Sequence, residues 1–289
     1  MPVRREDQHP SPEEFGCTLT IGIVAITGDN NFIVTGSDRL VSSNEGVVQG
    51  IETTLKARKI APSWGLMFAA TDANLFLPIV REVWDRLGHV DQTHDLEEVQ
   101  RVVADVYREK FDKAFTSGYL VRYGFKSIAD FKAAGFVQFG EHKFQDICDA
   151  IDKFDLGITL LGYGFDDERM PHIFQVDNPG RVTSHDLLRY AVIGSGYYMA
   201  MASLHRKKIP YHLDPLIYRV LEAKFSAETA PGVGKNTSLL WMDRVGETKS
   251  IGYGSIDEIK RIYCETLTSP EPEHAIDIIS TLTGTKKSA

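Results

Sequence analysis

The sequence predicts an α+β protein built as a four-layer αββα sandwich, in which two antiparallel sheets face each other and helices cover the outside. Three observations predict this class. Strand patterns come in pairs joined by short turns, helix patterns also come in pairs, and the two kinds of pair alternate along the chain. Since no repeat or linker divides the chain, we expect one domain over residues 18–265, after a leader or disordered segment 1–17 and before a polar tail 266–289.

The first predicted hairpin covers residues 18–35. Leu19, Ile21 and Ile23 alternate with small or polar residues, as in a strand that is buried on one face. A Gly-Asp-Asn-Asn turn at 28–31 leads to the second strand, 32–35. A second strand pair is predicted around residues 59–60 and 64–70, where an apolar run is of buried-strand length.

Two helices follow this strand pair. Residues 73–87 have apolar residues at helical spacing, and Pro78 is tolerated if it lies in the first turns. The second helix reaches residue 115, and Asp95 with Glu98 three positions later forms a capping-box pattern at its start. Residues 116–154 then read as two short helices rich in aromatic residues, a helical insertion that serves either as a packing extension or as a lid or subunit contact.

The second half repeats the alternation of strands and helices. Strands are predicted at 156–164, 172–176 and 190–193, helices at 197–207 and 214–228, strands at 237–242 and 248–253, and a last helix from residue 255. Asp214 is the expected N-cap of its helix, and Pro215 suits the first helical turn.

Composition excludes several classes of function. The 289-residue chain carries a net charge of −8 without a dense Lys/Arg cluster, which argues against a nucleic-acid partner. No apolar run is long enough to span a membrane, and the polar N-terminus has no signal-peptide core. Cys17, Cys148 and Cys264 lie far apart, which is typical of reduced thiols, so we expect a cytoplasmic protein. No His/Cys/Asp/Glu cluster has the spacing of a metal site, and no cofactor is expected.

Several stretches occur in an order that points to a family. They are TLTIGI at 18–23, TGSDR at 35–39, LKARKI at 55–60, AATDAN at 69–74, HIFQVDNPG at 172–180 and AVIGSGYYMA at 191–200. In this order they resemble the β-type subunits of the proteasome and their bacterial two-ring relatives, which are N-terminal-nucleophile hydrolases. The resemblance covers most of residues 18–263 and implies the αββα fold. It also implies a homo-oligomeric ring, with any unfoldase partner unknown.

The resemblance implies a set of catalytic residues. Thr18 is the nucleophile, and its own α-amine, freed when the leader is removed, is the general base. Lys56 lowers the pKa of the nucleophile, while Asp38 keeps that lysine charged and oriented. Ser195 and Glu228 support the site through hydrogen bonds, although Ser195 also suits a helix cap.

Three positions depart from the family. Cys17 stands between Gly16 and Thr18, whereas family leaders end in glycine directly before the threonine. Phe68 lies in the strand-to-helix turn that usually holds the oxyanion-hole glycine, and its bulk could narrow the cleft. Pro231 replaces a serine of the hydrogen-bond network and has no hydroxyl.

The expected function is therefore hydrolysis of peptide or other amide bonds by a threonine-type, proteasome-like enzyme. Two alternatives remain open from the sequence. One is a non-catalytic, ring-forming scaffold of the same fold, and the other is an amidase or acylase that uses Cys17 as its nucleophile. The substrate follows from none of these stretches, because pockets in such folds are built by several loops.

Overall fold

The computed structural model describes residues 20–39, 56–71, 73–87 and 94–267. The chain divides into two compact units, residues 1–251 and 252–289. The first unit holds all ten strands of the described chain together with the helices α1 to α5, and the second contributes the helix α6 (Tyr253–Leu267). The predicted leader, residues 1–17, lies outside the described residues, and so does the predicted tail 266–289 except for its first two residues, which belong to α6.

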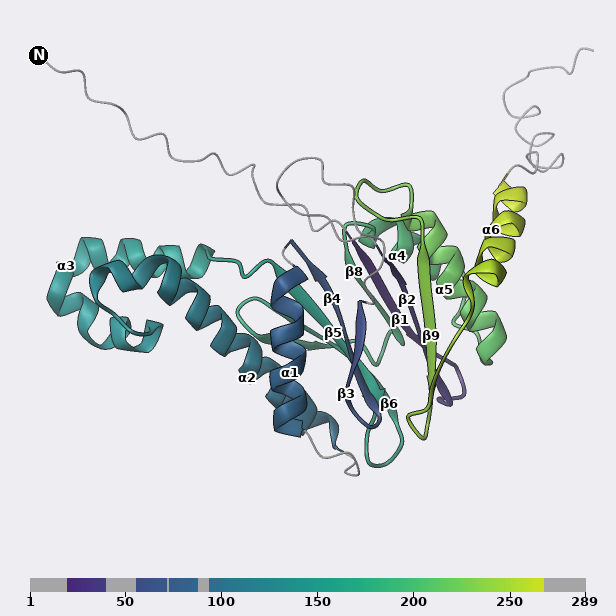
Figure 1. Cartoon of the computed structure of the whole chain (residues 1–289), viewed down its shortest axis with the longest axis horizontal. Coiled ribbons are helices and arrows are strands. Elements are labelled where there is room, and N and C mark those ends of the chain that lie inside the picture. The colour runs from purple at the N-terminus through teal and green to yellow at the C-terminus, as the bar shows by residue number, and fades with distance from the viewer. Residues whose placement is uncertain (1–19, 40–55, 72, 88–93, 268–289) are drawn as a thin grey trace, which may run out of the picture. The chain divides into compact units, whose positions relative to one another are not determined.

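The first sheet contains the predicted N-terminal hairpin at its centre (Figure 1). Its strand order is β10-β9-β2-β1-β8, and every neighbouring pair is antiparallel. The hairpin turn contains Asn30 at φ 62°, a conformation that asparagine tolerates better than most residues. The strands are β1 (Ile21–Ile26), β2 (Phe32–Asp38), β8 (Tyr190–Gly194), β9 (Thr237–Asp243) and β10 (Thr248–Ser250).

The second sheet has the order β3-β4-β5-β6-β7 and is also antiparallel throughout. Its edge strand β7 was not predicted from the sequence, because four residues that are exposed or half-buried give no apolar alternation. The strands are β3 (Ala57–Ala61), β4 (Trp64–Ala70), β5 (Ile158–Phe165), β6 (Pro171–Asp177) and β7 (Arg181–Ser184). The predicted mixture of helices with two antiparallel sheets is confirmed.

Side chains of β4 alternate between two hydrophobic clusters. Met67 and Ala69 belong to a cluster that joins the two sheets, where Val24 and Ile193 are contributed by the first sheet. Apolar residues on one face of each sheet thus bury each other, which is the main force holding two sheets together.

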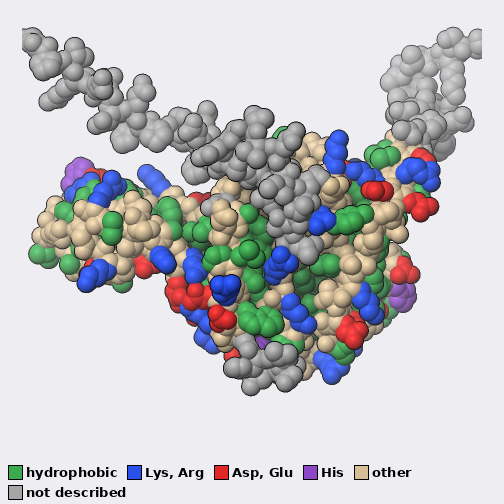
Figure 2. Space-filling view, in the orientation of Figure 1, with side chains coloured by type: hydrophobic (Ala, Val, Ile, Leu, Met, Phe, Trp, Pro, Cys, Tyr) green, Lys and Arg blue, Asp and Glu red, His purple; other side chains and the backbone are tan. Residues whose placement is uncertain are grey.

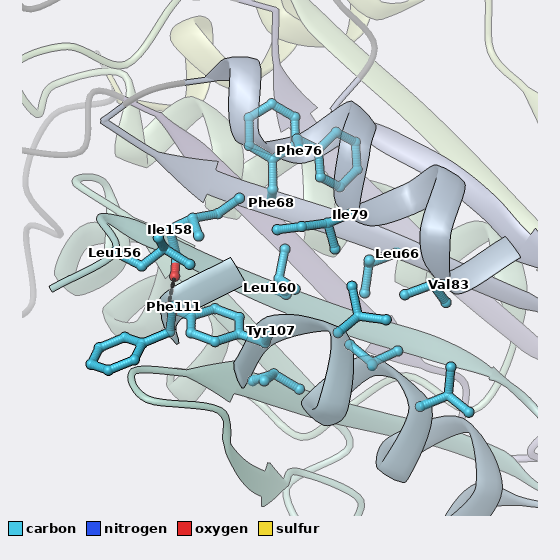
Figure 3. Close-up of a cluster of buried hydrophobic side chains, with 14 of the residues drawn as sticks. Leu66, Phe68, Phe76, Ile79, Val83, Tyr107, Phe111, Leu156, Ile158 and Leu160 are labelled. Atoms are coloured by element: carbon cyan, nitrogen blue, oxygen red, sulfur yellow. Dashed lines mark hydrogen bonds between the residues drawn. The ribbon is translucent and has the colours of Figure 1, made fainter. Parts of the chain in front are cut away.

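The other face of β4 packs against helices, as Figure 3 shows for Phe68 and Ile79. Leu66 and Phe68 lie in the cluster that also holds residues of η1 (Ala73–Leu75), α1 (Phe76–Leu87) and α2 (Leu96–Phe115). The buried hydroxyl of Tyr107 on α2 donates to the carbonyl oxygen of Ile158 at 2.7 Å, which ties this helix to β5. As predicted, Asp95 caps α2 by accepting the amide of Glu98 at 2.6 Å.

Two further helices of the first unit, α4 (Tyr197–His205) and α5 (Leu213–Ala227), pack on each other, and α5 lies against β1 and β2. The predicted N-cap of α5 is wrong. His212 occupies the cap position without a side-chain hydrogen bond, and Asp214 lies in the first turn instead. A carboxylate in the first turn still interacts favourably with the positive end of the helix dipole. This preference explains why an aspartate occurs close to the start of α5 without being its cap.

The insertion at 116–154 contains the two helices that were predicted, which meet at a kink, and two short helical turns precede them. It consists of a π-helical turn η2 (Thr116–Leu120), a 3-10 turn η3 (Val121–Tyr123) and α3 (Ile128–Lys153), which is interrupted at Gly140 (φ 74°, ψ 175°). Phe131 lies 5.4 Å from Phe125 and 5.1 Å from Phe144 between ring centroids. The aromatic residues of the insertion therefore pack on one another.

Charged side chains of both signs are interspersed on the face drawn in Figure 2. On α1 and α2, for example, Arg86 lies 2.7 Å from Glu82 and 2.5 Å from Glu109. A nucleic-acid-binding surface would instead gather Lys and Arg on one face. Within the described residues, no helix combines the length and the apolar character that crossing a membrane requires.

Two predicted boundaries at the end of the described chain are also wrong. The strand expected over 248–253 ends at Ser250, and α6 begins at Tyr253 instead of residue 255. The pattern of apolar residues does not locate such ends, because the last residues of a helix or strand are defined by backbone hydrogen bonds, which the pattern does not reveal.

Candidate functional site

The first residue of β1 and the last residue of β2 lie at the same end of the first sheet. Gly22 pairs with Ser37 in the β1–β2 ladder, so Asp38 lies beside the first residue of β1. On the other side of β1, Ile21 pairs with Gly194, the last residue of β8. Antiparallel pairing thus brings together three positions that are far apart in sequence.

Asp38 and Lys56 form a buried ion pair at this end of the sheet. The carboxylate is 0% and the lysine side chain 2% exposed, and Lys56 Nζ lies 2.5 Å from Asp38 Oδ1. The amide groups of Ile21 and Gly234 also donate to Asp38, at 3.1 and 2.9 Å. Charges this deeply buried are stable only with such partners, so the surrounding chain is organised around the pair.

Burial lowers the pKa of Lys56 from its ordinary value, while the Asp38 carboxylate opposes this shift. The lysine therefore exchanges its proton more readily than an exposed lysine does. An amine of this kind can assist proton transfer at a neighbouring hydroxyl or stabilise the alkoxide that forms there.

Thr20 supplies that hydroxyl. Its Oγ1 donates to Asp38 Oδ1 at 2.9 Å and accepts a hydrogen bond from Lys56 Nζ. The side chain is 2% exposed. No role was predicted for Thr20 from the sequence, because threonine is common in β-strands. Counting residue pairs outward from the hairpin turn pairs Asp38 with Ile21, the residue after Thr20, so the register indicates this end of β1 but does not single out Thr20.

Ser195 lies directly against the backbone of Thr20. The Thr20 amide donates to Ser195 Oγ at 3.3 Å, and the same hydroxyl donates to the Thr20 carbonyl oxygen at 3.2 Å. The alternative role of Ser195 as a helix cap is not observed, because Gly196 is the cap residue of α4. A serine at this place would contact an α-amine if the chain began at Thr20.

Gly194 permits this close approach. Its φ is +99°, and a Cβ at this position would lie 2.2 Å from the Thr20 carbonyl oxygen. Only glycine fits both conditions, so the Gly-Ser-Gly stretch is explained by the contact between β8 and the start of β1.

Glu228 lies at the end of α5 and pairs with Lys224 at a distance of 2.5 Å between Oε1 and Nζ. Of the predicted site residues, the structure thus brings Asp38, Lys56 and Ser195 together with Thr20, whereas Glu228 is bonded to a different lysine. Thr18 and Cys17 lie outside the described residues.

The two remaining departures from the family pattern are both placed. Phe68 is 3% exposed and stacks on Phe76 with ring centroids 4.0 Å apart, so its bulk fills the helix-facing core and does not project into a cleft. Pro231 is exposed in the loop after α5.

Other candidate sites do not coincide with this cluster. A cavity of about 820 Å³ is lined by Lys59 and by residues of α1 and α2, and it shares no residue with the cluster. Among the residues that the structure describes, no three His, Cys, Asp or Glu side chains are grouped so as to hold a metal ion.

Comparison with known proteins yields a likeness of fold. No family model and no curated protein matches this chain. A solved structure described as an Anbu (Gly-1) mutant from Hyphomicrobium sp. strain MC1 is similar to it, with a TM-score of 0.59. The two share 14% sequence identity over 88% of this chain and 99% of that one. At this identity the likeness supports a distant proteasome-like fold and carries no activity with it.

Proposed function

We propose that this protein is a threonine-type N-terminal-nucleophile hydrolase of peptide or other amide bonds, built as a four-layer αββα sandwich. The observation that carries the proposal is the threonine hydroxyl of Thr20, which is hydrogen-bonded to both members of the buried Asp38–Lys56 pair. A hydroxyl that contacts a lysine of lowered pKa and a carboxylate supports this proposal, because a neighbouring amine can activate a threonine as a nucleophile.

The reaction follows from these contacts. The threonine Oγ attacks the substrate carbonyl carbon, and its proton moves to the free α-amine, whose ordinary pKa of about 8 suits this role. The protonated amine then gives the proton to the leaving nitrogen, which leaves an ester on the threonine. Water hydrolyses the ester with the α-amine again as base, which restores the hydroxyl. Lys56 stabilises the developing alkoxide, Asp38 orients Lys56, and Ser195 holds the amine.

Two threonines compete for the nucleophile. The resemblance to proteasome subunits favours Thr18, which requires cleavage after Cys17. The contacts favour Thr20, which requires cleavage after Leu19, because its hydroxyl meets Lys56 and its nitrogen meets Ser195. Either choice uses the same Asp38–Lys56 pair.

Intact mass and N-terminal sequencing of the purified protein test the proposal. A chain that begins at Thr20 or Thr18 supports it and identifies the nucleophile. A chain that begins at Cys17 moves the nucleophile to a thiol and favours the acylase. A chain that retains its first residues, and that a threonine-directed electrophile such as a β-lactone does not label, contradicts the proposal.

An uncleaved chain that the electrophile does not label would favour a non-catalytic scaffold of the same fold. The proline at 231 is the observation on its side, because it lacks the hydroxyl that the family uses near its threonine. Assembly into a homo-oligomeric ring is common to both functions and rests on analogy with proteasome-like proteins. Light scattering on the purified protein would show a single high mass if a ring forms.

A further inference from the structure

The helix α5 carries a lysine that is completely buried. Lys224 is 0% exposed, although lysine is among the residues least often found inside a protein. Its ammonium group must therefore be held by hydrogen bonds, since an isolated buried charge would cost several kcal/mol.

Three acceptors surround this ammonium group. Lys224 Nζ lies 2.5 Å from Glu228 Oε1 and donates to the carbonyl oxygens of Gly234 and Lys235, both at 3.0 Å. Glu228 is the first residue after the helix, whereas Gly234 and Lys235 lie in the loop that leads to β9. The lysine thus fastens both ends of the 228–235 loop to the helix.

The 228–235 loop contacts the candidate site through the backbone amide of Gly234. The nitrogen of Gly234 donates to Asp38 Oδ2 at 2.9 Å, while Oδ1 of the same carboxylate bonds to Lys56. A path of contacts therefore runs from Lys224 to the Gly234 carbonyl oxygen, along the Gly234 backbone to its amide, and from there to Asp38 and Lys56. All of its members are buried, so each contact is electrostatically stronger than it would be in water.

We propose that Lys224 is a positioning residue that sets the Asp38 carboxylate, and through it Lys56, by holding the 228–235 loop. Glu228 acts in the same way, because it holds Lys224. The link to catalysis rests on the proposed function, whereas the link between Lys224 and Lys56 does not. A merely structural lysine would stabilise the fold and leave the protonation of Lys56 unchanged.

The test uses Lys224→Met combined with Glu228→Gln, which removes both charges and leaves neither unpaired. The matched control is Lys110→Met combined with Glu82→Gln, which removes the 2.7 Å ion pair between α2 and α1, away from the cluster. The measurement is the titration of the Lys56 Cε signal in protein with ¹³C-labelled lysine, identified by its loss in Lys56→Met. Folding of each variant is checked by chemical denaturation.

We expect release of the loop to admit water to Lys56, so that its pKa rises toward the ordinary value of about 10.4 in the double variant and stays unchanged in the control. Labelling of the nucleophile by a β-lactone should also slow, on the order of tenfold to a hundredfold, as for a misplaced catalytic group. An unchanged Lys56 titration in a folded double variant would overturn the inference.

If the double variant does not fold, Glu228→Ala alone provides the test, since it removes the acceptor that holds Lys224 at the start of the loop and leaves the two carbonyl acceptors in place. A smaller rise of the Lys56 pKa then supports the inference, and no rise contradicts it. If wild-type protein is never labelled, the proposed function fails while the titration still decides the role of Lys224.

Discussion

Ser195 Oγ bridges the backbone of Thr20, at 3.3 Å from its nitrogen and 3.2 Å from its carbonyl oxygen. These residues are 175 positions apart and meet because β8 pairs with β1. The serine is therefore placed to bind the Thr20 nitrogen both as the amide of the intact chain and as the free amine that cleavage after Leu19 would produce.

Replacing Ser195 by alanine should slow acylation while leaving the fold intact. The variant loses one hydrogen bond at the nitrogen, worth about 0.5–1.5 kcal/mol, so the rate of β-lactone labelling should fall by roughly twofold to tenfold. Ser117→Ala is the control, because Ser117 is exposed in η2. Equal labelling rates in the two variants would remove Ser195 from the mechanism.

Replacing Lys56 by methionine should abolish labelling and also destabilise the protein. Asp38 would remain as a buried carboxylate without its counter-charge, which costs about 3–5 kcal/mol. The double variant Lys56→Met/Asp38→Asn should lose less free energy of unfolding than the single variant, although it too should be inactive. Denaturant titrations of both variants measure the difference, and a processed Lys56→Met protein with wild-type turnover would contradict the mechanism.

Replacing Gly194 by alanine should disrupt the start of β1. The positive φ alone disfavours a Cβ by about 1–3 kcal/mol, and the contact with the Thr20 carbonyl oxygen adds to this. Gly118→Ala is a suitable control, because no atom lies within 4 Å of the added Cβ. The free energy of unfolding should fall only in the first variant, and a stable Gly194→Ala protein would argue against the close approach.

His172 should contribute a pH-dependent part of the stability. Burial lowers its pKa, but hydrogen bonds to Asp186 and Asp166 outweigh this, so the folded-state pKa is raised above 6.5. A raised folded-state pKa means that the stabilisation is fully present below the unfolded pKa and is lost as pH rises through the folded value.

The measurement for His172 is the free energy of unfolding of wild type and of His172→Asn between pH 5 and pH 9. The wild type should exceed the variant most at pH 5 to 6, and the two curves should converge as the pH rises. Burial raises the pKa of Asp186, but its bonds to His172 and Ile173 lower it overall, so this carboxylate stays charged through that range. A constant difference between the curves would show that His172 does not titrate as described.

Much of the fold could be predicted because it depends on local patterns. The alternation of Ile21 and Ile23, the Gly-Asp-Asn-Asn turn and the capping box at Asp95 each involve residues within a few positions of one another. The short edge strand β7 and the cap of α5 were missed, because exposed or irregular backbone leaves no periodic signal.

By itself, the sequence determined the classes of element, their order and the candidate residues Asp38, Lys56 and Ser195. Only the tertiary structure decided which groups meet, namely that Thr20 contacts the ion pair and that Lys224 takes Glu228 and holds Gly234 against Asp38. The physical reason is the separation along the chain of the residues that interact. Strand and helix patterns arise from neighbours in the chain, whereas the register of β1 with β2 and β8 is set by burial and hydrogen bonds between segments up to 175 residues apart.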